Sequence, residues 1–263
     1  MTGREELLPG GFVAEVVRVG DTVRRTLPPN AEFVAALLRH LAPTGLAPRH
    51  LGVDERGRQV LSHLDGRVPW QEREDAAYFS DAALTRLGGL IRTLHDACAG
   101  TGLAGDAETV CHRDLSPKNT VYRDSPSGPL PVAFLDWDLA GPGRRIEDVA
   151  FACWHWGELG GDADPAELGR RCRLLCDAYD AAAGAPSPVG AGADPAGVPL
   201  PRDELIDVML HQIEGTWRGI AAGADRGDPA MRRLRAAGAD EGVRRWHDWL
   251  LHHRPAVHHA LHP

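Results

Sequence analysis

The chain has 263 residues, of which 43% are hydrophobic, and its formal net charge is -8. This length and apolar content suffice for one large core or two modest ones, and they exclude a chain that is disordered throughout. The negative charge argues against a nucleic-acid polymer as the partner, because phosphate backbones are bound through clustered Lys and Arg. A cationic small molecule would suit this charge better.

Cysteine usage and the absence of a leader pattern predict a location in the reducing cytoplasm. The chain has five cysteines, none of them in a CxxC pair, and its start does not combine basic residues with an apolar run. No stretch approaches the roughly 18 consecutive apolar residues that a membrane span requires, so we expect no membrane association. Monomer and homodimer both stay open.

The first 65 residues predict a small lobe that is rich in strands. Short apolar runs on either side of Gly20-Asp21 predict a β-hairpin over residues 12–27. Apolar residues at helical spacing predict a helix over 31–42, and residues 51–64 return to two strand-like segments around a turn. This order is typical of a small α+β lobe.

Residues 66–263 predict a larger and mainly helical lobe. A start signal at Ser80-Asp81 precedes an apolar stripe, and a second hairpin follows over residues 110–135. Further helices are predicted over 148–156, 165–182, 203–222 and 228–251. Residues 183–201, rich in Gly, Ala and Pro, are typical of a mobile surface loop.

The last residues, 252–263, contain five histidines together with Pro255 and Pro263. This composition predicts a frayed tail. Because the tail offers no ordered acidic companion, we favour a tail over a metal site for these histidines.

The residues that carry chemistry lie in His112-Arg113-Asp114-Leu115-Ser116-Pro117-Lys118-Asn119 and in Leu135-Asp136-Trp137-Asp138. Phosphoryl transfer to an alcohol needs a carboxylate that accepts the hydroxyl proton and oxygen ligands that hold Mg²⁺ against the nucleotide phosphates. Asp114, Asn119 and Asp136 supply these groups. Since Asn119 begins one strand of the predicted hairpin and Asp136 ends its partner, both ligands should lie at one edge, beside Asp114.

The pattern His-x-Asp-x-x-x-x-Asn followed by Asp-x-Asp resembles the catalytic signature of the aminoglycoside phosphotransferase and choline kinase superfamily. The likeness extends over nearly the whole chain. It implies an α+β, bilobal protein-kinase-like fold, with a nucleotide-binding lobe over 1–65 and a catalytic and acceptor-binding lobe over 66–263. It also implies transfer of the γ-phosphoryl group of ATP, with Mg²⁺, to a hydroxyl of an aminoglycoside, amino-alcohol or sugar. Antibiotic resistance is one role of such enzymes.

The resemblance also implies roles for individual residues. Asp114 corresponds to the catalytic base, Asn119 and Asp136 to the magnesium ligands, and Asp138 to the second acidic position. His112 is expected to brace the catalytic loop.

Two further acidic features have more than one interpretation. Asp148 matches an aspartate that bonds the catalytic-loop backbone in this superfamily, but an acidic residue favoured by the helix dipole explains it equally well. Glu158, Asp162, Asp164 and Glu167 lie near where acceptors bind in the family, and exposed loop acids are the slightly favoured explanation.

The nucleotide-binding lobe departs from the kinase pattern because no Lys follows its hairpin. Arg25 is the expected substitute for gripping the phosphates, although the adjacent Arg24 makes a solvated Arg25 a real alternative. In a strand Val23 shares a face with Arg25, so Val23 would line the base pocket. The remaining nucleotide contacts are expected at Gly10 and Gly11, near the phosphates, and over Ser62 to Leu64, the interlobe hinge beside adenine.

The chain carries Val34 where the resemblance predicts a helical Glu, and Glu32 is the nearest acid. The missing Lys and displaced Glu are typical of a catalytically weak kinase-like binding or immunity protein that sequesters a ligand. A protein kinase is a less favoured alternative: Arg113 gives the loop a His-Arg-Asp, but Ser116 replaces the phosphate-binding Lys and no Ala-Pro-Glu follows.

Overall fold

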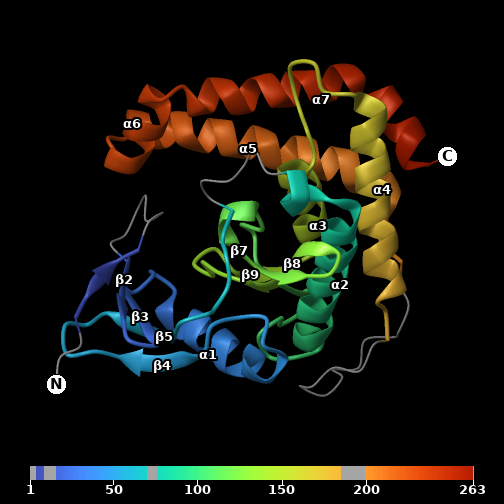
Figure 1. The fold of residues 1–263 in the computed structure, drawn as a ribbon. Coiled ribbons are helices and arrows are strands. Elements are labelled where there is room, and N and C mark those ends of the chain that lie inside the picture. The colour runs from blue at the N-terminus through green and yellow to red at the C-terminus, as the bar shows by residue number, and fades with distance from the viewer. Residues whose placement is uncertain (1–3, 9–15, 70–75, 185–198, 263) are drawn as a thin grey trace.

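The structure is a computed structural model that describes residues 4–8, 16–69, 76–184 and 199–262. A small sheet lies at one end of the molecule and a larger, mainly helical part makes up the rest (Figure 1). The predicted α+β class is therefore confirmed. The predicted loop over 183–201 falls mostly on residues 185–198, outside the described residues.

The N-terminal sheet is antiparallel throughout, in the order β1-β2-β3-β5-β4. Gly20, at φ 60°, takes the left-handed turn conformation between β2 and β3 that glycine adopts without strain. Val23 pairs with Leu61 and Arg25 with Gln59. The strands are β1 (Glu6–Leu7), β2 (Val16–Val19), β3 (Thr22–Arg25), β4 (His50–Val53) and β5 (Gln59–Ser62).

Helix α1 (Ala31–Leu41) connects this sheet to the helical part. Its apolar face is buried in the same core cluster as Leu61 of β5 and the apolar stripe of the next helix. The His40 ring also makes a 2.6 Å hydrogen bond, through Nε2, to the carbonyl oxygen of Ala97. The sheet and the helices thus share one continuous core.

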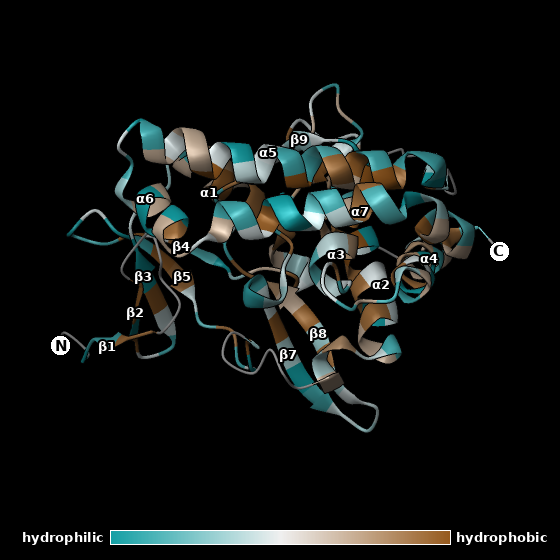
Figure 2. Ribbon diagram, turned by 90° about the horizontal axis from the view of Figure 1, so that it is seen from above, coloured by the Kyte–Doolittle hydropathy of each residue, from teal (hydrophilic) through white to brown (hydrophobic). Residues whose placement is uncertain are grey.

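The helical part is built around a central hairpin. Helix α2 begins after Ser80, whose hydroxyl accepts a hydrogen bond from the Ala83 amide, and its predicted apolar stripe is buried. Helices α5 and α7 run side by side along one face (Figures 1 and 2). The helices are α2 (Asp81–Cys98), α3 (Arg145–Trp156), α4 (Pro165–Ala181), α5 (Leu205–Asp225), α6 (Pro229–Ala236) and α7 (Ala239–Leu261); the strands are β6 (Thr109–Cys111), β7 (Thr120–Ser125), β8 (Gly128–Phe134) and β9 (Gly141–Gly143).

The C-terminal helix differs from its prediction at both ends. Gly238, at φ 73°, separates α6 from α7, so the single helix predicted over 228–251 is two helices. The frayed tail predicted over 252–263 is wrong, because α7 continues to Leu261 and buries Val257 and Leu261. Gly169 of α4 permits this packing, since a Cβ there would lie 2.4 Å from the Val257 carbonyl oxygen.

None of the helices in the described ranges is long and apolar enough to cross a bilayer.

Candidate active site

The β7–β8 hairpin brings the two predicted magnesium ligands to one edge. Thr120, the first residue of β7, pairs with Phe134, the last residue of β8. The Leu135 amide then donates a 2.7 Å hydrogen bond to the Asn119 carbonyl oxygen. Asn119 precedes one strand and Asp136 follows the other, which is the geometry expected from their spacing.

Asp114 lies directly beside Asn119. The Asn119 amide nitrogen donates to the Asp114 carboxylate at 2.7 Å and to its backbone carbonyl at 2.9 Å. Lys118, the single lysine of the chain, has its ammonium nitrogen 3.4 Å from the same carboxylate. Burial raises the pKa of Asp114, and the Lys118 charge opposes that rise.

His112 is buried below Asp114 and braces the loop through both ring nitrogens. Nδ1 accepts a hydrogen bond from the Asp114 amide at 3.3 Å, so Nε2 carries the proton and donates to the Leu135 carbonyl oxygen at 2.9 Å. Burial lowers the pKa of His112, which keeps the ring neutral. The ring therefore connects the loop to the residue that precedes Asp136.

Asp148, at the start of α3, accepts hydrogen bonds from the backbone amides of His112 at 2.7 Å and Arg113 at 2.8 Å. Of its two interpretations, the contact with the loop backbone is the one that the structure bears out. Burial acts to raise the pKa of Asp148, but hydrogen bonds from His95 and the Arg113 amide outweigh it and lower the pKa below its ordinary value.

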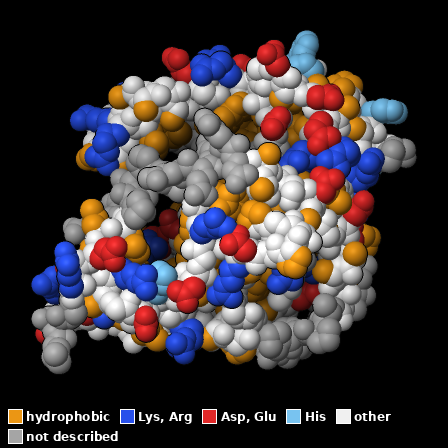
Figure 3. All heavy atoms as spheres, viewed as in Figure 1, with side chains coloured by type: hydrophobic (Ala, Val, Ile, Leu, Met, Phe, Trp, Pro, Cys, Tyr) orange, Lys and Arg blue, Asp and Glu red, His pale blue; other side chains and the backbone are white. Residues whose placement is uncertain are grey.

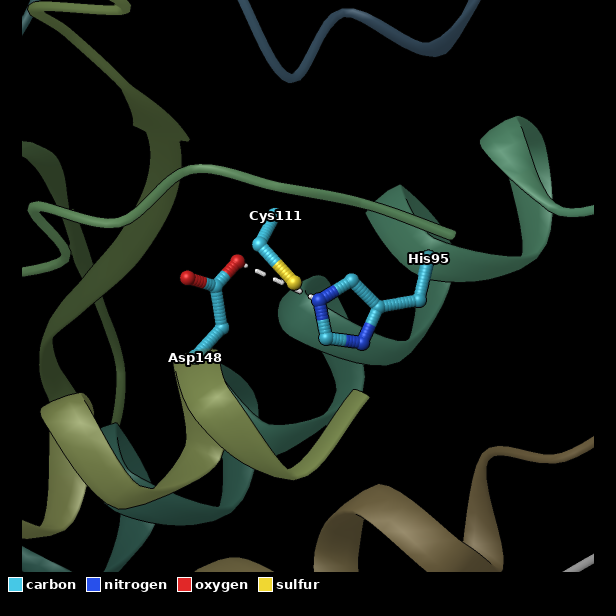
Figure 4. Close-up of side chains that lie close together, drawn as sticks. All are labelled: His95, Cys111 and Asp148. Atoms are coloured by element: carbon cyan, nitrogen blue, oxygen red, sulfur yellow. Dashed lines mark hydrogen bonds and ion pairs between the residues drawn. The ribbon is translucent and has the colours of Figure 1, made fainter. Parts of the chain in front are cut away.

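A buried chain of side chains supports Asp148, and Figure 4 shows its last link, the contact of His95 with Asp148. Arg145 donates to the Tyr179 hydroxyl at 3.1 Å, and this hydroxyl lies 2.8 Å from His95 Nδ1. The Asp148 carboxylate only accepts, so Nε2 of His95 donates to it at 3.2 Å, and in this tautomer Nδ1 accepts from the Tyr179 hydroxyl. Cys111, also drawn in Figure 4, donates to the Arg144 carbonyl oxygen at 3.2 Å.

Sequence reasoning missed His95 and Tyr179. In the sequence, His95 is only a histidine on the apolar face of a predicted helix. Most histidines in that position are core residues whose hydrogen bonds are satisfied within the core. Only the structure shows that its hydrogen-bond partner is Asp148, the aspartate that holds the loop carrying Asp114.

Two described residues other than glycine have positive φ, Arg113 at 65° and Asp136 at 61°, and both border the site. Such left-handed backbone costs about 1–3 kcal/mol at an ordinary residue and collects at functional sites. Here the Arg113 guanidinium donates to the Pro142 carbonyl oxygen, a contact that glycine could not make.

Arg25 reaches from β3 to the acidic pair that follows β8. Its Nη1 lies 3.1 Å from Asp136 Oδ1, and its Nη2 forms an ion pair with Asp138 Oδ2. Burial raises the pKa of Asp138, and Arg25 opposes that rise. Arg24 points to the other face of the strand, where it bonds the Thr22 hydroxyl and lies 3.7 Å from Asp54.

The expected helical partner of Arg25 is absent. Val34 is buried, Glu32 is exposed, and the described carboxylates that contact Arg25, Asp136 and Asp138, follow β8. Asp138 Oδ1 is buried and has no hydrogen-bond partner among the described residues. Together with Asp136 and the amide oxygen of Asn119, it makes a set of hard oxygen donors of the kind that Mg²⁺ prefers. The residues at this edge therefore fit a magnesium ion.

The other predicted nucleotide contacts are only partly described. Gly10 and Gly11 lie outside the described residues. Val23 packs against the main core on the Arg25 face of β3. The amide of Ser62 donates to the Arg49 carbonyl and the amide of His63 to the Asp21 carbonyl, both at 2.9 Å. These two amides are therefore already used, and adenine would have to bond to the backbone carbonyl oxygens of this segment or to the backbone of Leu64.

A pocket of about 640 Å³ lies at the C-terminal end of α3. Glu158 and Asp162 from the predicted acidic stretch line it, together with Trp154 and Trp246. The other two acids of that stretch have structural roles: Asp164 caps α4, and Glu167 pairs with Arg170 at 2.7 Å.

Comparisons with known proteins agree with the fold. The family model described as "Phosphotransferase enzyme family" matches residues 96–185. The trifolitoxin immunity protein of Rhizobium leguminosarum bv. trifolii is 30% identical over 98% of this chain and 98% of its own length. A choline/ethanolamine kinase family protein from Mesorhizobium loti has a similar fold, with TM-score 0.60, 17% identity and coverage of 97% of this chain and 92% of that one. The GDP complex of aminoglycoside 2'-phosphotransferase-IIIa gives TM-score 0.53 and 14% identity over 99% and 93%.

Proposed function

This chain belongs to the phosphotransferase enzyme family, and from that membership we propose that it transfers the γ-phosphoryl group of Mg-ATP to a hydroxyl of a small molecule. The observation that carries the proposal is the convergence of Asp114, Asn119 and Asp136 at one edge of the β7–β8 hairpin. A carboxylate base and oxygen donors for magnesium at one place are what phosphoryl transfer to an alcohol requires.

In this proposal Asp114 orients the acceptor hydroxyl and takes up its proton as the new oxygen–phosphorus bond forms. Asn119 holds the Asp114 carboxylate through its amide nitrogen, and His112 fixes the loop. Asp136, Asp138 and the Asn119 amide oxygen would hold Mg²⁺. When bound, the ion neutralises charge on the phosphates.

Arg25 would contact the phosphates of the nucleotide. Its guanidinium carries charge at any workable pH and presents two donors to oxygen anions. Its contacts with Asp136 and Asp138 put that charge at the proposed magnesium edge, so we expect nucleotide binding to redistribute these ion pairs.

The pocket at the end of α3 is the proposed site for part of the acceptor. Two carboxylates and two indole rings suit a cationic ligand, through charge attraction and cation–π contact. Asp148, at the start of α3, contacts the loop that carries Asp114, and Gly157, at the end of the helix, lines the pocket. The two residues are nine positions apart, about 14 Å along a helix. This pocket would therefore hold a part of the acceptor that is remote from the reacting hydroxyl.

The test is a phosphate-transfer assay of the purified protein against aminoglycosides, amino-alcohols, sugars and nucleosides. ATP and GTP are supplied separately, because a similar structure holds GDP. We expect one acceptor class to gain a phosphoryl group, detected by mass spectrometry, and the product to form at least about a hundredfold more slowly with Asp114→Asn. If calorimetry shows that the protein binds neither Mg-ATP nor Mg-GTP, the enzymatic proposal is wrong.

A second candidate function is immunity against a toxin, and the relative that is named an immunity protein favours it. Immunity can come from phosphorylating the toxin or from sequestering it. Expression of wild type and Asp114→Asn in cells exposed to the toxin separates the two. Protection by wild type alone indicates chemistry, whereas equal protection by both indicates binding.

A further inference from the structure

Two histidines near the end of α7 lie one helical turn apart. The His262 amide donates a 3.0 Å hydrogen bond to the His258 carbonyl oxygen, and the two ring centroids are 4.6 Å apart. Residues at i and i+4 occupy the same face of a helix, so both imidazoles point to the same side. The pair exists because α7 continues to Leu261 and does not end in a frayed tail.

An acidic residue from a distant segment completes the cluster. Asp203 belongs to a short 3₁₀ turn, Arg202–Glu204, just before α5. Its Oδ1 lies 3.5 Å from His262 Nε2, and one ligand atom of each of Asp203, His258 and His262 lies within 4.8 Å of the other two. His262 Nε2 is buried and makes no hydrogen bond to any described residue, since the Asp203 contact at 3.5 Å is an ion-pair distance only. A buried nitrogen of this kind costs free energy unless a ligand satisfies it.

The backbone on both sides of the cluster is anchored by other contacts. Arg202 pairs with Asp177 at 2.5 Å and with Asp180 at 2.6 Å, which fixes the turn against α4. Arg254 of α7 pairs with Asp207 of α5 at 2.7 Å. The three ligands are therefore held near one another by the fold itself.

We propose that Asp203, His258 and His262 form a site for a divalent transition metal, with Zn²⁺ as the ion that fits the donors. Two imidazoles and one carboxylate, with a remaining position for water, are a known ligand set for zinc. Mg²⁺ and Ca²⁺ prefer oxygen donors alone. The Asp203 side chain is 91% exposed, which leaves the open side of the site accessible to solvent.

The site lies far from the proposed nucleotide edge. The C-terminus is at the end of the molecule opposite the N-terminal sheet in both ribbon views (Figures 1 and 2), and histidine side chains protrude from the surface over α7 (Figure 3). A bound ion would connect the start of α5 to the end of α7. Its role is to clamp these helices, and it takes no part in the phosphoryl-transfer site.

The test is a calorimetric Zn²⁺ titration of the full chain with excess Mg²⁺, which would occupy the proposed site at Asp136. We expect one zinc per chain, and His258→Ala, His262→Ala and Asp203→Ala each to weaken binding at least about tenfold. His252→Ala and His259→Ala are matched controls on the same helix, and both should bind zinc like wild type. At free zinc about a hundred times Kd, the Tm of wild type should rise by about 5 °C, and that of His258→Ala should rise less.

Three results would overturn the proposal. The first is no saturable zinc binding, and the second is equal affinity in wild type and the three ligand variants. The third is a thiolate-to-metal absorption band in the Co²⁺-loaded protein, because it would assign the ion to the buried cysteines. None of these measurements depends on catalysis. They would therefore distinguish an active phosphotransferase that lacks the zinc site from an inactive protein that binds zinc.

Discussion

Arg25 and Asp136 are 111 residues apart in the sequence and form an ion pair between the N-terminal sheet and the segment after β8, with 3.1 Å between Nη1 and Oδ1. Asp136 is also a proposed magnesium ligand, so its carboxylate has two possible cationic partners. Arg25, the proposed substitute for the usual lysine, is therefore within contact distance of the proposed magnesium edge.

Replacing Arg25 tests this arrangement. Arg25→Ala should weaken ATP binding at saturating Mg²⁺ at least about tenfold, because charged hydrogen bonds to phosphate are lost. Arg25→Lys should retain part of the affinity, since a point charge still attracts phosphate. Arg24→Ala is the control and should bind ATP like wild type, because Arg24 faces Asp54. If Arg24→Ala is the damaging change, our assignment of the phosphate-binding arginine is wrong.

Asp114→Asn tests the proposed base. The amide cannot accept the hydroxyl proton, so turnover should fall at least about a hundredfold. ATP affinity measured by calorimetry and Tm should stay close to those of wild type, because the substitution keeps the size of the side chain. An unchanged kcat would show that Asp114 takes no part in proton transfer.

The pH dependence of catalysis should report the charge of Lys118. Burial raises the pKa of Asp114 and Lys118 opposes that rise, so Lys118→Gln should raise this pKa further. The acid limb of kcat/KM against pH should then move to higher pH, because Asp114 ionises, and so becomes able to act as a base, only at a higher pH. Lys118→Arg keeps the charge and should leave the limb near its wild-type position. Added salt should reduce the difference, since Lys118 is half-exposed.

The buried chain behind Asp148 should affect both stability and turnover. Tyr179→Phe leaves His95 Nδ1 without its donor, so the free energy of unfolding should fall by about 1–3 kcal/mol in urea denaturation. Tyr122→Phe is a matched control, because it removes a buried hydroxyl that accepts from Trp156 at 2.9 Å. Both variants should be less stable, but only Tyr179→Phe should lower kcat under conditions where both are folded. Equal kcat values would make His95 and Tyr179 purely structural.

Local patterns in the sequence predicted much of the fold. The stripe of α2, its Ser80 cap and the two hairpins depend on residues close together in the chain, and all are present. The edge that holds Asn119 and Asp136 was predictable for the same reason. Residues at the two ends of a hairpin must meet.

Contacts between distant segments could not be predicted in this way. The pairing of Arg25 with the acids after β8, and of His95 with Asp148, depends on how separate elements pack. The end of α7 is a similar case: Pro255 and the histidines favour fraying, but burial of Val257 and Leu261 against α4 outweighs them.

The left-handed backbone at Arg113 has a consequence for the order of folding. The segment resists this conformation until Asp148 binds its amides, and Asp148 belongs to a helix 35 residues further along. We therefore expect the loop to take its final shape after the folding transition state. Arg113→Gly should change the unfolding rate and leave the refolding rate nearly constant in stopped-flow denaturant jumps. A segment that forms last also opens at low cost, so activity should disappear under mild denaturation before the helices melt.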